Sequence, residues 1–428
     1  MFRLSCIGRF LLLAIAAAAL LYRLPEAGAE PERLPQAAFV RGGDLWLSIG
    51  GAEIQATAGD RAAAPTWSAD GQFVAYAAGE QGDRIRVYSV AGKQSFPVYD
   101  GGVNFQWAPN ANRLAFLSGG LLNVADITAD GAAPFRNVVG GVGNYSWQPG
   151  GSGFLVSTNA QLLPDGWTSV RLLEVPADAN MDPSRAKPLF TLPKPSDNFF
   201  AVGTSPFRWS ADRSRIAFIA HPTASLSADS NTLCVLSADG RDFRTPARML
   251  NDYHWFQWAP RAGTLAFLEG EGRFVLEDRK RLGLARFAAA RRTDLTPPGT
   301  TERDFAWIDD RTIVVSRSAF AGKDVAPAER PLPALYRIPL PNDGQRQLTA
   351  PPPGSGDFAP TVLGGGRTLA WVRTDRTRAD AWIADADGTN ARVFISGIGV
   401  GESYYECWNW DDALAWYDPP PLAPRQAR

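Results

Sequence analysis

The sequence predicts an all-β fold, a β-propeller of eight four-stranded blades closed by its N- and C-terminal strands, with seven blades as the alternative. Three observations lead to it. A unit with a tryptophan, a polar turn and an alanine–aromatic pair recurs eight times, at intervals of about 40 to 60 residues. Strands of alternating apolar and polar residues follow each unit. The two ends of the chain each contain only part of a blade.

The repeated unit predicts the first two strands of each blade. The units begin at Pro65, Asn104, Asn144, Pro206, Trp255, Asp304, Ala359 and Tyr405, with Val362 in the tryptophan position of the seventh. Because side chains alternate along a strand, the tryptophan and the residue two positions earlier face the same way and can pack on the next blade. Burial of such aromatic residues is worth roughly 2 to 3 kcal/mol each. Turn formers such as Asp70-Gly71 then reverse the chain.

The ends of the chain predict how the ring closes. The last unit stops after two strands, at Tyr417, whereas the segment from Phe39 holds a third and a fourth strand with no inner strand before them. We therefore expect each end to supply two strands of one blade, which leaves no open sheet edge.

The N-terminus has the features of a secretory signal peptide. Arg3 and Arg9 flank an apolar run of twelve residues, Phe10 to Leu21, and Ala27-Gly28-Ala29 offers a cleavage site. Such a run is short for a bilayer span, although an uncleaved anchor is the alternative. We expect a signal peptide at 1–29, a linker at 30–38, one propeller domain at 39–417 and a Pro-rich disordered tail at 418–428. The protein would be exported to the periplasm, cell envelope or extracellular space, with no membrane span after cleavage.

Composition narrows the classes of partner. The chain has 428 residues, 20% of them charged, and a formal net charge of −1. A nucleic-acid partner would need a basic face, so none is expected, and we expect a monomer. After cleavage only Cys234 and Cys407 remain, about half a ring apart, which favours two buried residues over a disulfide.

Catalytic motifs are scarce in the sequence. There are two histidines and no Gly-x-Ser-x-Gly elbow. The residues just before each tryptophan should face the inner ring, and none is a carboxylate or histidine: Thr66, Gln106, Ser146, Arg208, Gln257, Ala306, Thr361 and Cys407. We therefore expect no metal, no cofactor and no catalytic residue.

Long connections predict a binding rim instead. Insertions near residues 157–169, 194–205, 220–232 and 251–257 should open on one face of the ring, where binding residues concentrate. The candidate partner- or ligand-binding residues on this rim are Asp165, Trp167, Asp197, Phe199, Phe200, His221, Asp229, His254 and Trp255. Rings beside carboxylates and histidine suit a peptide or a glycan. The alternative is that Phe199, Phe200 and Trp255 fold inward and cap the blades.

Several repeats also resemble those of a known family. The segments beginning at Trp67, Trp209 and Asp385 are similar to the Trp-Ser-x-Asp-Gly repeats of TolB and its relatives, over nearly the whole mature chain. TolB has an N-terminal α/β domain and six blades, whereas here that domain is expected to be missing and eight repeats are counted. The resemblance implies an exported scaffold that binds a protein or a peptidoglycan-type envelope component.

Together these observations predict an exported, non-catalytic binding scaffold that is not an enzyme. The alternative is a propeller hydrolase acting on a glycan or lactone through Asp165, Asp197 or Asp229. A structural or sensory module is a third possibility.

Overall fold

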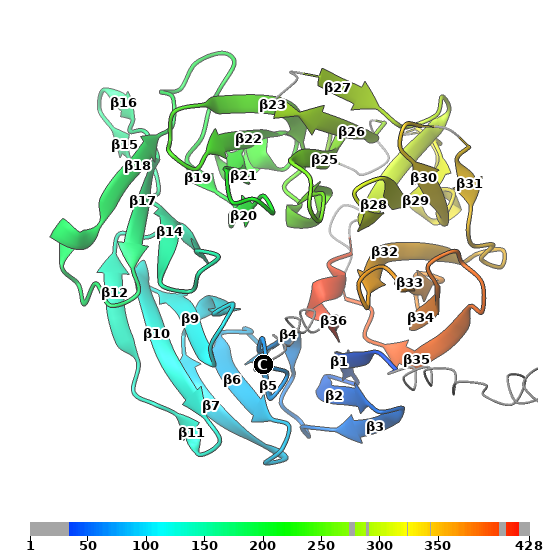
Figure 1. Cartoon of the computed structure of the whole chain (residues 1–428), viewed down its shortest axis with the longest axis horizontal. Helices are drawn as coiled ribbons and strands as arrows, with labels where there is room; N and C mark the ends of the chain where they lie inside the picture. The colour runs from blue at the N-terminus through cyan, green and yellow to red at the C-terminus, as the bar shows by residue number, and fades with distance from the viewer. Residues whose placement is uncertain are drawn as a thin grey trace, which may run out of the picture. The chain divides into compact units, whose positions relative to one another are not determined.

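The computed structural model describes residues 34–273, 279–287, 291–322, 324–342, 344–401 and 408–418. Contacts separate a short N-terminal unit, Met1–Leu34, from the compact unit Pro35–Arg428. The second unit is a ring of eight antiparallel sheets, so the predicted eight-bladed propeller is confirmed (Figure 1).

Blades 1 to 4 follow one another along the chain, and each runs from an innermost to an outermost strand. Blade 1 contains β4 (Ala63–Trp67), β5 (Phe73–Ala78), β6 (Arg84–Ser89) and β7 (Gln94–Asp100). Blade 2 contains β8 (Val103–Trp107), β9 (Arg113–Ser118), β10 (Leu121–Thr128) and an outer strand in two pieces, β11 (Gly131–Ala132) and β12 (Arg136–Gly140). Blade 3 contains β13 (Asn144–Trp147), β14 (Gly153–Ser157), β17 (Arg171–Pro176) and β18 (Lys187–Thr191). Blade 4 has an inner strand in two pieces, β19 (Gly203–Thr204) and β20 (Arg208–Trp209), then β21 (Arg215–His221), β22 (Asn231–Ser237) and β23 (Phe243–Met249).

Blades 5 to 7 continue the ring and blade 8 closes it. Blade 5 contains β24 (Phe256–Trp258), β25 (Thr264–Glu269), β26 (Arg281–Arg286) and β27 (Arg291–Asp294). Blade 6 contains β28 (Thr300–Asp309), β29 (Thr312–Ala319), β30 (Ala334–Pro339) and β31 (Arg346–Gln347). Blade 7 contains β32 (Gly356–Leu363), β33 (Thr368–Thr374), β34 (Ala379–Asp385) and β35 (Arg392–Ile398). Blade 8 contains β36 (Leu414–Tyr417), β1 (Gln36–Arg41), β2 (Asp44–Ile49) and β3 (Ala52–Gln55).

Short elements lie in the connections. They are the hairpin β15 (Leu162–Leu163) and β16 (Gly166–Trp167), the helix α2 (Ala224–Ser227), and the 3-10 turns η1 (Pro183–Arg185), η2 (Tyr253–Trp255), η4 (Pro327–Glu329) and η5 (Trp410–Asp412). Within the described ranges, no helix is long and apolar enough to cross a bilayer. Cys234 is a buried free thiol, and Cys407 lies outside the described residues.

The tryptophans join neighbouring blades through a repeated hydrogen bond. Five of them donate the indole N–H to the main-chain oxygen of the residue before the tryptophan of the preceding blade, whereas the buried Trp209 N–H has no partner among the described residues. The donor–acceptor distances are 3.0 Å for Trp107 to Thr66, 3.1 Å for Trp147 to Gln106, 3.0 Å for Trp258 to Arg208, 3.2 Å for Trp307 to Gln257 and 3.0 Å for Trp67 to Ala415. The sequence therefore builds a polar seam as well as the predicted apolar one, and each bond satisfies an indole donor inside the ring.

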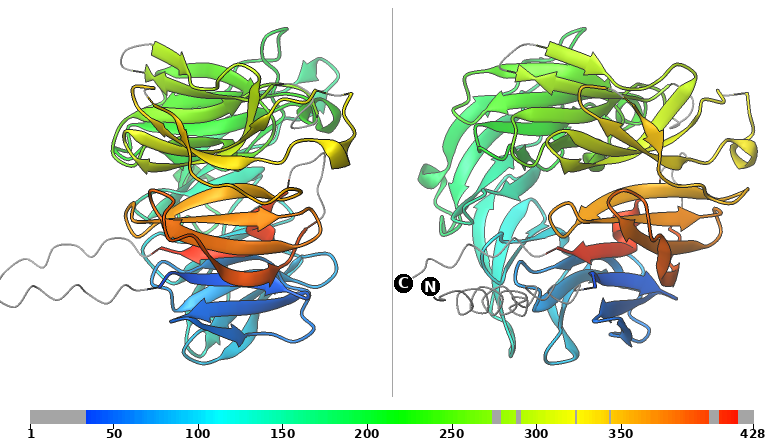
Figure 2. Two further views of the ribbon diagram at one scale, coloured as in Figure 1. Left: turned by 90° about the vertical axis from the view of Figure 1, so that its right-hand side faces the viewer. Right: turned by 45° about the vertical axis from the view of Figure 1, so that its right-hand side comes forward.

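The closing blade is shared between the chain ends, as expected, but in a different proportion. Only β36 comes from the C-terminus, and β1, β2 and β3 come from the N-terminus (Figure 2). Ala415-Trp416 fills the place expected for Cys407-Trp408, because Trp67 bonds to the Ala415 oxygen. The expected two-plus-two division is wrong because Ala38-Phe39, both 0% exposed, supply the alanine–aromatic pair of the second strand.

Candidate functional site

A cavity opens at the rim where the innermost strands begin. It has a volume of about 650 Å³ and is enclosed mainly by residues of blades 5 to 8. Its polar side chains include Asp252 and His254 before β24, Asp304 in β28 and Asp411 in η5. A second cavity of about 750 Å³ lies toward blades 1 and 2 and shares His254 and Asp411 with the first. The central segment 409–412 (η5 and Asn409, red in Figure 1) borders both.

His254 is held between two carboxylates. Its Nε2 lies 2.7 Å from Asp411 Oδ2, and its Nδ1 lies 3.4 Å from Asp252 Oδ1. Asp252 also accepts a bond of 2.8 Å from the His254 main-chain N–H, which caps η2 and fixes the histidine backbone. Burial alone would lower the pKa of His254, but the hydrogen bonds and negative charges of Asp252 and Asp411 outweigh it and raise the pKa to about 10. The side chain is therefore an imidazolium at neutral pH.

Asp411 is the ionised carboxyl of the cavity. Burial tends to raise its pKa, but the hydrogen bond and charge of His254, together with the charge of Arg208, bring the pKa below its ordinary value. Its side chain nevertheless keeps 66% of its surface exposed. A carboxylate that is both ionised and accessible can accept a proton from a bound molecule.

Asp304 is shifted in the opposite direction. Removal from water, assisted by the negative charge of Asp252, raises its pKa to about 6 despite a hydrogen bond from the Ala359 N–H and the charges of Arg303 and His254. That bond measures 3.0 Å and comes from a bulge in β32 where Ala359 has a φ of 46°. The cavity thus holds one carboxyl that is easily protonated and another that stays ionised.

Aromatic rings form the walls between these groups. Trp408 and Trp410 stack at 6.2 Å with an interplanar angle of 21°, and both line the cavity. Tyr253 and Phe305 line it from blades 5 and 6. The walls therefore combine apolar faces with a few polar groups, as ligand sites do.

Of the nine residues predicted for the rim, only His254 lines this cavity. Phe199 and Trp255 are 7% and 1% exposed and pack in apolar cores, as the capping alternative proposed. The ring centres of Trp167 and Phe200 lie 6.1 Å apart, so the two side chains pack on each other. Asp229 is bonded to Arg273 at 2.9 Å.

The remaining three rim residues are also placed apart from the cavity. Asp165 and Asp197 are exposed in different connections. His221 ends β21, where burial lowers its pKa to about 4 and its Nδ1 has no partner within the described part of the chain. The structure therefore does not bring the nine residues together.

Sequence reasoning missed Asp252, Asp304 and Asp411. On the inner strands it considered the residue before each tryptophan, whereas Asp304 stands three residues before Trp307; on the 251–257 connection it selected His254 and Trp255 but not Asp252. A signal was present, since Asn104 and Asn144 occupy the same place before Trp107 and Trp147 and are joined by a 2.8 Å hydrogen bond.

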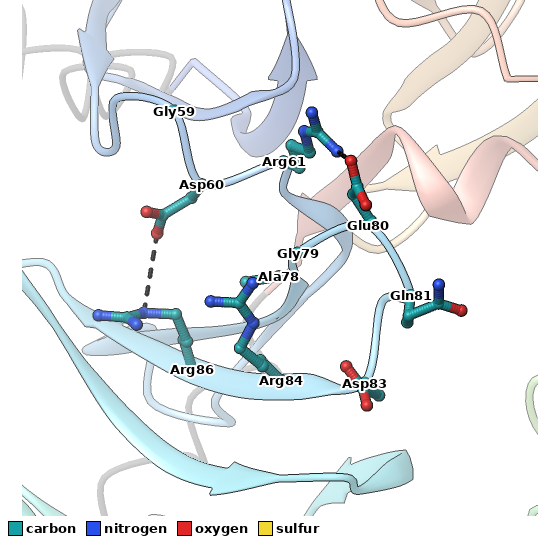
Figure 3. Close-up of a pocket in the computed structure, with 10 residues that line it drawn as sticks. All are labelled: Gly59, Asp60, Arg61, Ala78, Gly79, Glu80, Gln81, Asp83, Arg84 and Arg86. Atoms are coloured by element: carbon teal, nitrogen blue, oxygen red, sulfur yellow. Dashed lines mark hydrogen bonds and ion pairs between the residues drawn. The ribbon is translucent and has the colours of Figure 1, made fainter.

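A third cavity lies in blade 1, between the β3–β4 and β5–β6 connections, and has a volume of about 440 Å³ (Figure 3). Its charged residues are three arginines and three acids: Arg61, Arg84, Arg86, Asp60, Glu80 and Asp83. Arg61 pairs with Glu80, and Arg86 Nε lies 3.7 Å from Asp60 Oδ2. Because these charges largely compensate one another, we favour the cavity at blades 5 to 8 as the functional site.

Among the residues that the structure describes, no group of three or more His, Cys, Asp and Glu side chains is arranged to hold a metal ion.

Comparisons with known proteins support the fold. No family model and no curated protein matches the chain. A solved mutant of puromycin hydrolase complexed with PGG is 16% identical, with 79% of this chain and 54% of that chain covered and a TM-score of 0.50. The dihydro-heme d1 dehydrogenase NirN in complex with DHE is 15% identical, with 87% and 75% covered and a TM-score of 0.55. The chain thus spans about half the length of the puromycin hydrolase, and at these identities the likeness concerns the fold.

These findings overturn the prediction of a non-catalytic scaffold that is not an enzyme. Two of the solved structures similar in fold to this chain are a hydrolase and a dehydrogenase. The prediction depended on the lack of an assembled set of titratable groups, and Asp252, His254, Asp304 and Asp411 form such a set. The confirmed part of the expected resemblance is an eight-bladed propeller.

Proposed function

We propose that this protein is a propeller hydrolase that cleaves glycosidic bonds in the cavity at blades 5 to 8. The observation that carries the proposal is the opposite displacement of two carboxyl pKa values in one cavity, raised for Asp304 and lowered for Asp411. Environments that separate two carboxyls in this way create an acid and a base, and glycosidases use such a pair.

The roles follow from the protonation states. Protonated Asp304 donates its proton to the oxygen of the leaving sugar as the glycosidic C–O bond breaks. Asp411 removes a proton from a water molecule, whose oxygen bonds to the anomeric carbon. Asp411 then releases this proton to solvent, and Asp304 takes up a proton from solvent, so one water is consumed for each bond cleaved.

His254 and Asp252 have a positioning role. The His254 imidazolium pairs with Asp411 Oδ2 through Nε2, which leaves Asp411 Oδ1 available to the water. Its positive charge also keeps Asp411 ionised. The half-buried Trp408, which stacks on the buried Trp410, provides an apolar face for a sugar ring, which presents an apolar C–H surface.

The site of action is part of the proposal. The predicted signal segment at 1–29 supports an exported enzyme, and the Trp-Ser-x-Asp-Gly repeats support kinship with TolB-type propellers. The similarity to puromycin hydrolase supports hydrolysis only through the shared fold.

The test is hydrolysis of a panel of nitrophenyl glycosides, polysaccharides and lactones. We expect glycoside cleavage, and a loss in kcat of about 10²- to 10⁴-fold for Asp304→Asn and for Asp411→Asn. Asp165→Asn is the matched control, because this carboxyl is exposed on the β15–β16 hairpin. The rate should fall as the pH rises through about 6, where Asp304 loses its proton.

Two results contradict the proposal. One is a folded Asp304→Asn protein with wild-type kcat. The other is cleavage of lactones alone, or of nothing on the panel, by protein with an intact far-ultraviolet circular dichroism spectrum.

A further inference from the structure

One arginine stands out among the residues that face the inner ring. The positions just before the eight tryptophans or their substitute are occupied by Thr66, Gln106, Ser146, Arg208, Gln257, Ala306, Thr361 and Ala415. Arg208 is the one charged residue in this set, and it lines the same cavity as Asp304 and Asp411. A charge in the wall of a ligand cavity needs either an internal partner or a ligand.

The plane of the Arg208 guanidinium is fixed by the protein. Its central carbon lies 3.8 Å from the centre of the Tyr253 ring and 5.6 Å from that of Phe256. Its Nε donates a hydrogen bond of 3.3 Å to the Tyr253 main-chain oxygen. Stacking and one hydrogen bond orient the group while using one of its five N–H donors.

The other donors of this guanidinium have no partner in the described part of the chain. With the residues that the structure describes, Nη1 and Nη2 form neither an ion pair nor a hydrogen bond. The charge of Asp411 is close enough to interact, but its carboxylate is paired with His254. A planar fork of free N–H groups in a fixed orientation matches the two oxygens of a carboxylate.

We propose that the substrate is an acidic glycan of the uronic-acid class, and that Arg208 binds the carboxylate of one of its sugars. This inference depends on the proposed function for the identity of the ligand as a glycan. Without Arg208, the negative charges of Asp252 and Asp411 would face an incoming anion in this cavity, offset chiefly by the His254 charge. Arg208 makes the cavity acceptable to a negatively charged sugar and sets its orientation.

The test measures binding separately from cleavage. Titration calorimetry with Asp304→Asn protein compares oligouronides with neutral and sulfated oligosaccharides of equal length. We expect the oligouronide to bind at least about 10-fold more tightly than its neutral counterpart, with an affinity that falls as salt rises. Arg208→Gln in the same background should abolish this preference, and Arg208→Lys should keep part of it because the charge remains while the fork is lost.

The control is Arg241→Gln, because that side chain is 87% exposed and carries its charge away from the cavity. Its oligouronide affinity should equal that of the parent, and thermal melts should show that every variant is folded. Equal binding of neutral and acidic sugars, tighter binding of sulfated sugars, or an unchanged preference in Arg208→Gln would overturn the inference.

The outcomes separate the two proposals. Oligouronide binding that depends on Arg208, without cleavage by the wild type, would leave this inference standing and remove the hydrolase. Cleavage of neutral glycans that requires Asp304 but is unchanged in Arg208→Gln would support the hydrolase and remove this inference.

Discussion

The two histidines of this chain should titrate far apart. The sequence contains only His221 and His254, both with an ordinary pKa of 6.5. Burial without a compensating charge lowers the pKa of His221 to about 4. For His254, burial also acts to lower the pKa, but the bonds and charges of Asp252 and Asp411 raise it to about 10. We expect two imidazole resonances in the proton–carbon correlation spectrum, one titrating near each value.

The signs of the stability effects differ accordingly. The His254 pKa is raised by folding, so its contribution is fully present below 6.5 and is lost as the pH rises through about 10. At about 1.4 kcal/mol per pKa unit the contribution is at most about 5 kcal/mol. Because 43% of the side chain is exposed, solvent screening leaves roughly 1 to 2 kcal/mol. The His221 pKa is lowered by folding, so the free energy of unfolding decreases, by at most about 3 kcal/mol, as the pH falls from 6.5 through about 4.

Urea denaturation measures both effects. Between about pH 7 and pH 10.5 the wild type should lose roughly 1 to 2 kcal/mol more than His254→Gln. Between about pH 6.5 and pH 4.5 the wild type should lose more stability than His221→Gln. Each variant is the matched control for the other, since each removes one of the two titrations. Two resonances that both titrate near 6.5, or stability curves of His254→Gln and wild type that run parallel at high pH, would refute the assigned ion pairs.

Two further predictions concern the ring itself. Trp107→Phe should lower the free energy of unfolding by about 1 kcal/mol more than Trp382→Phe, because the Trp107 indole donates to the Thr66 oxygen whereas the Trp382 N–H has no partner among the described residues. Equal shifts in the urea midpoint would contradict the hydrogen-bonded seam. Glu302→Gln should cost about 3 to 5 kcal/mol, because it leaves Arg317 without its buried partner at 2.7 Å. Glu53→Gln, which breaks the more exposed pair with Arg41, should cost less than about 1 kcal/mol, and a similar cost for both would show that burial is not decisive.

The fold was predictable because its determinants are local and repeated. A first strand with tryptophan and a second with an alanine–aromatic pair are visible in most units, and eight units imply a ring. The division of the closing blade between the chain ends was not predictable, because Ala415-Trp416 fits both the tryptophan position of a first strand and the alanine–aromatic pattern of a second strand. Pairing decides between them, and β36 pairs with Ala37 to Phe39 of the distant N-terminus.

The site was less predictable because no local pattern marks it. His254 was named as a binding residue, but its partner Asp411 is 157 residues away along the chain and meets it only across the ring. Asp304 owes its raised pKa to its surroundings: it is enclosed in β28, and its hydrogen bond comes from a bulge in the next blade. Such environments depend on how blades pack, which periodicity does not encode.

The division of the closing blade determines where one residue of the site lies. In the predicted two-plus-two division, Trp408 lies on the innermost strand, and Asp411-Asp412 form the turn to the second strand at the opposite rim. In the structure the innermost strand begins at Leu414, so η5 precedes it and Asp411 lies at the rim where β24 and β28 begin. A shift of one strand in the closure thus moves a carboxylate from a solvent-facing turn to within 2.7 Å of His254. The C-terminal segment that seals the ring also delivers the ionised carboxyl of the cavity, which couples the integrity of the closure to the proposed chemistry.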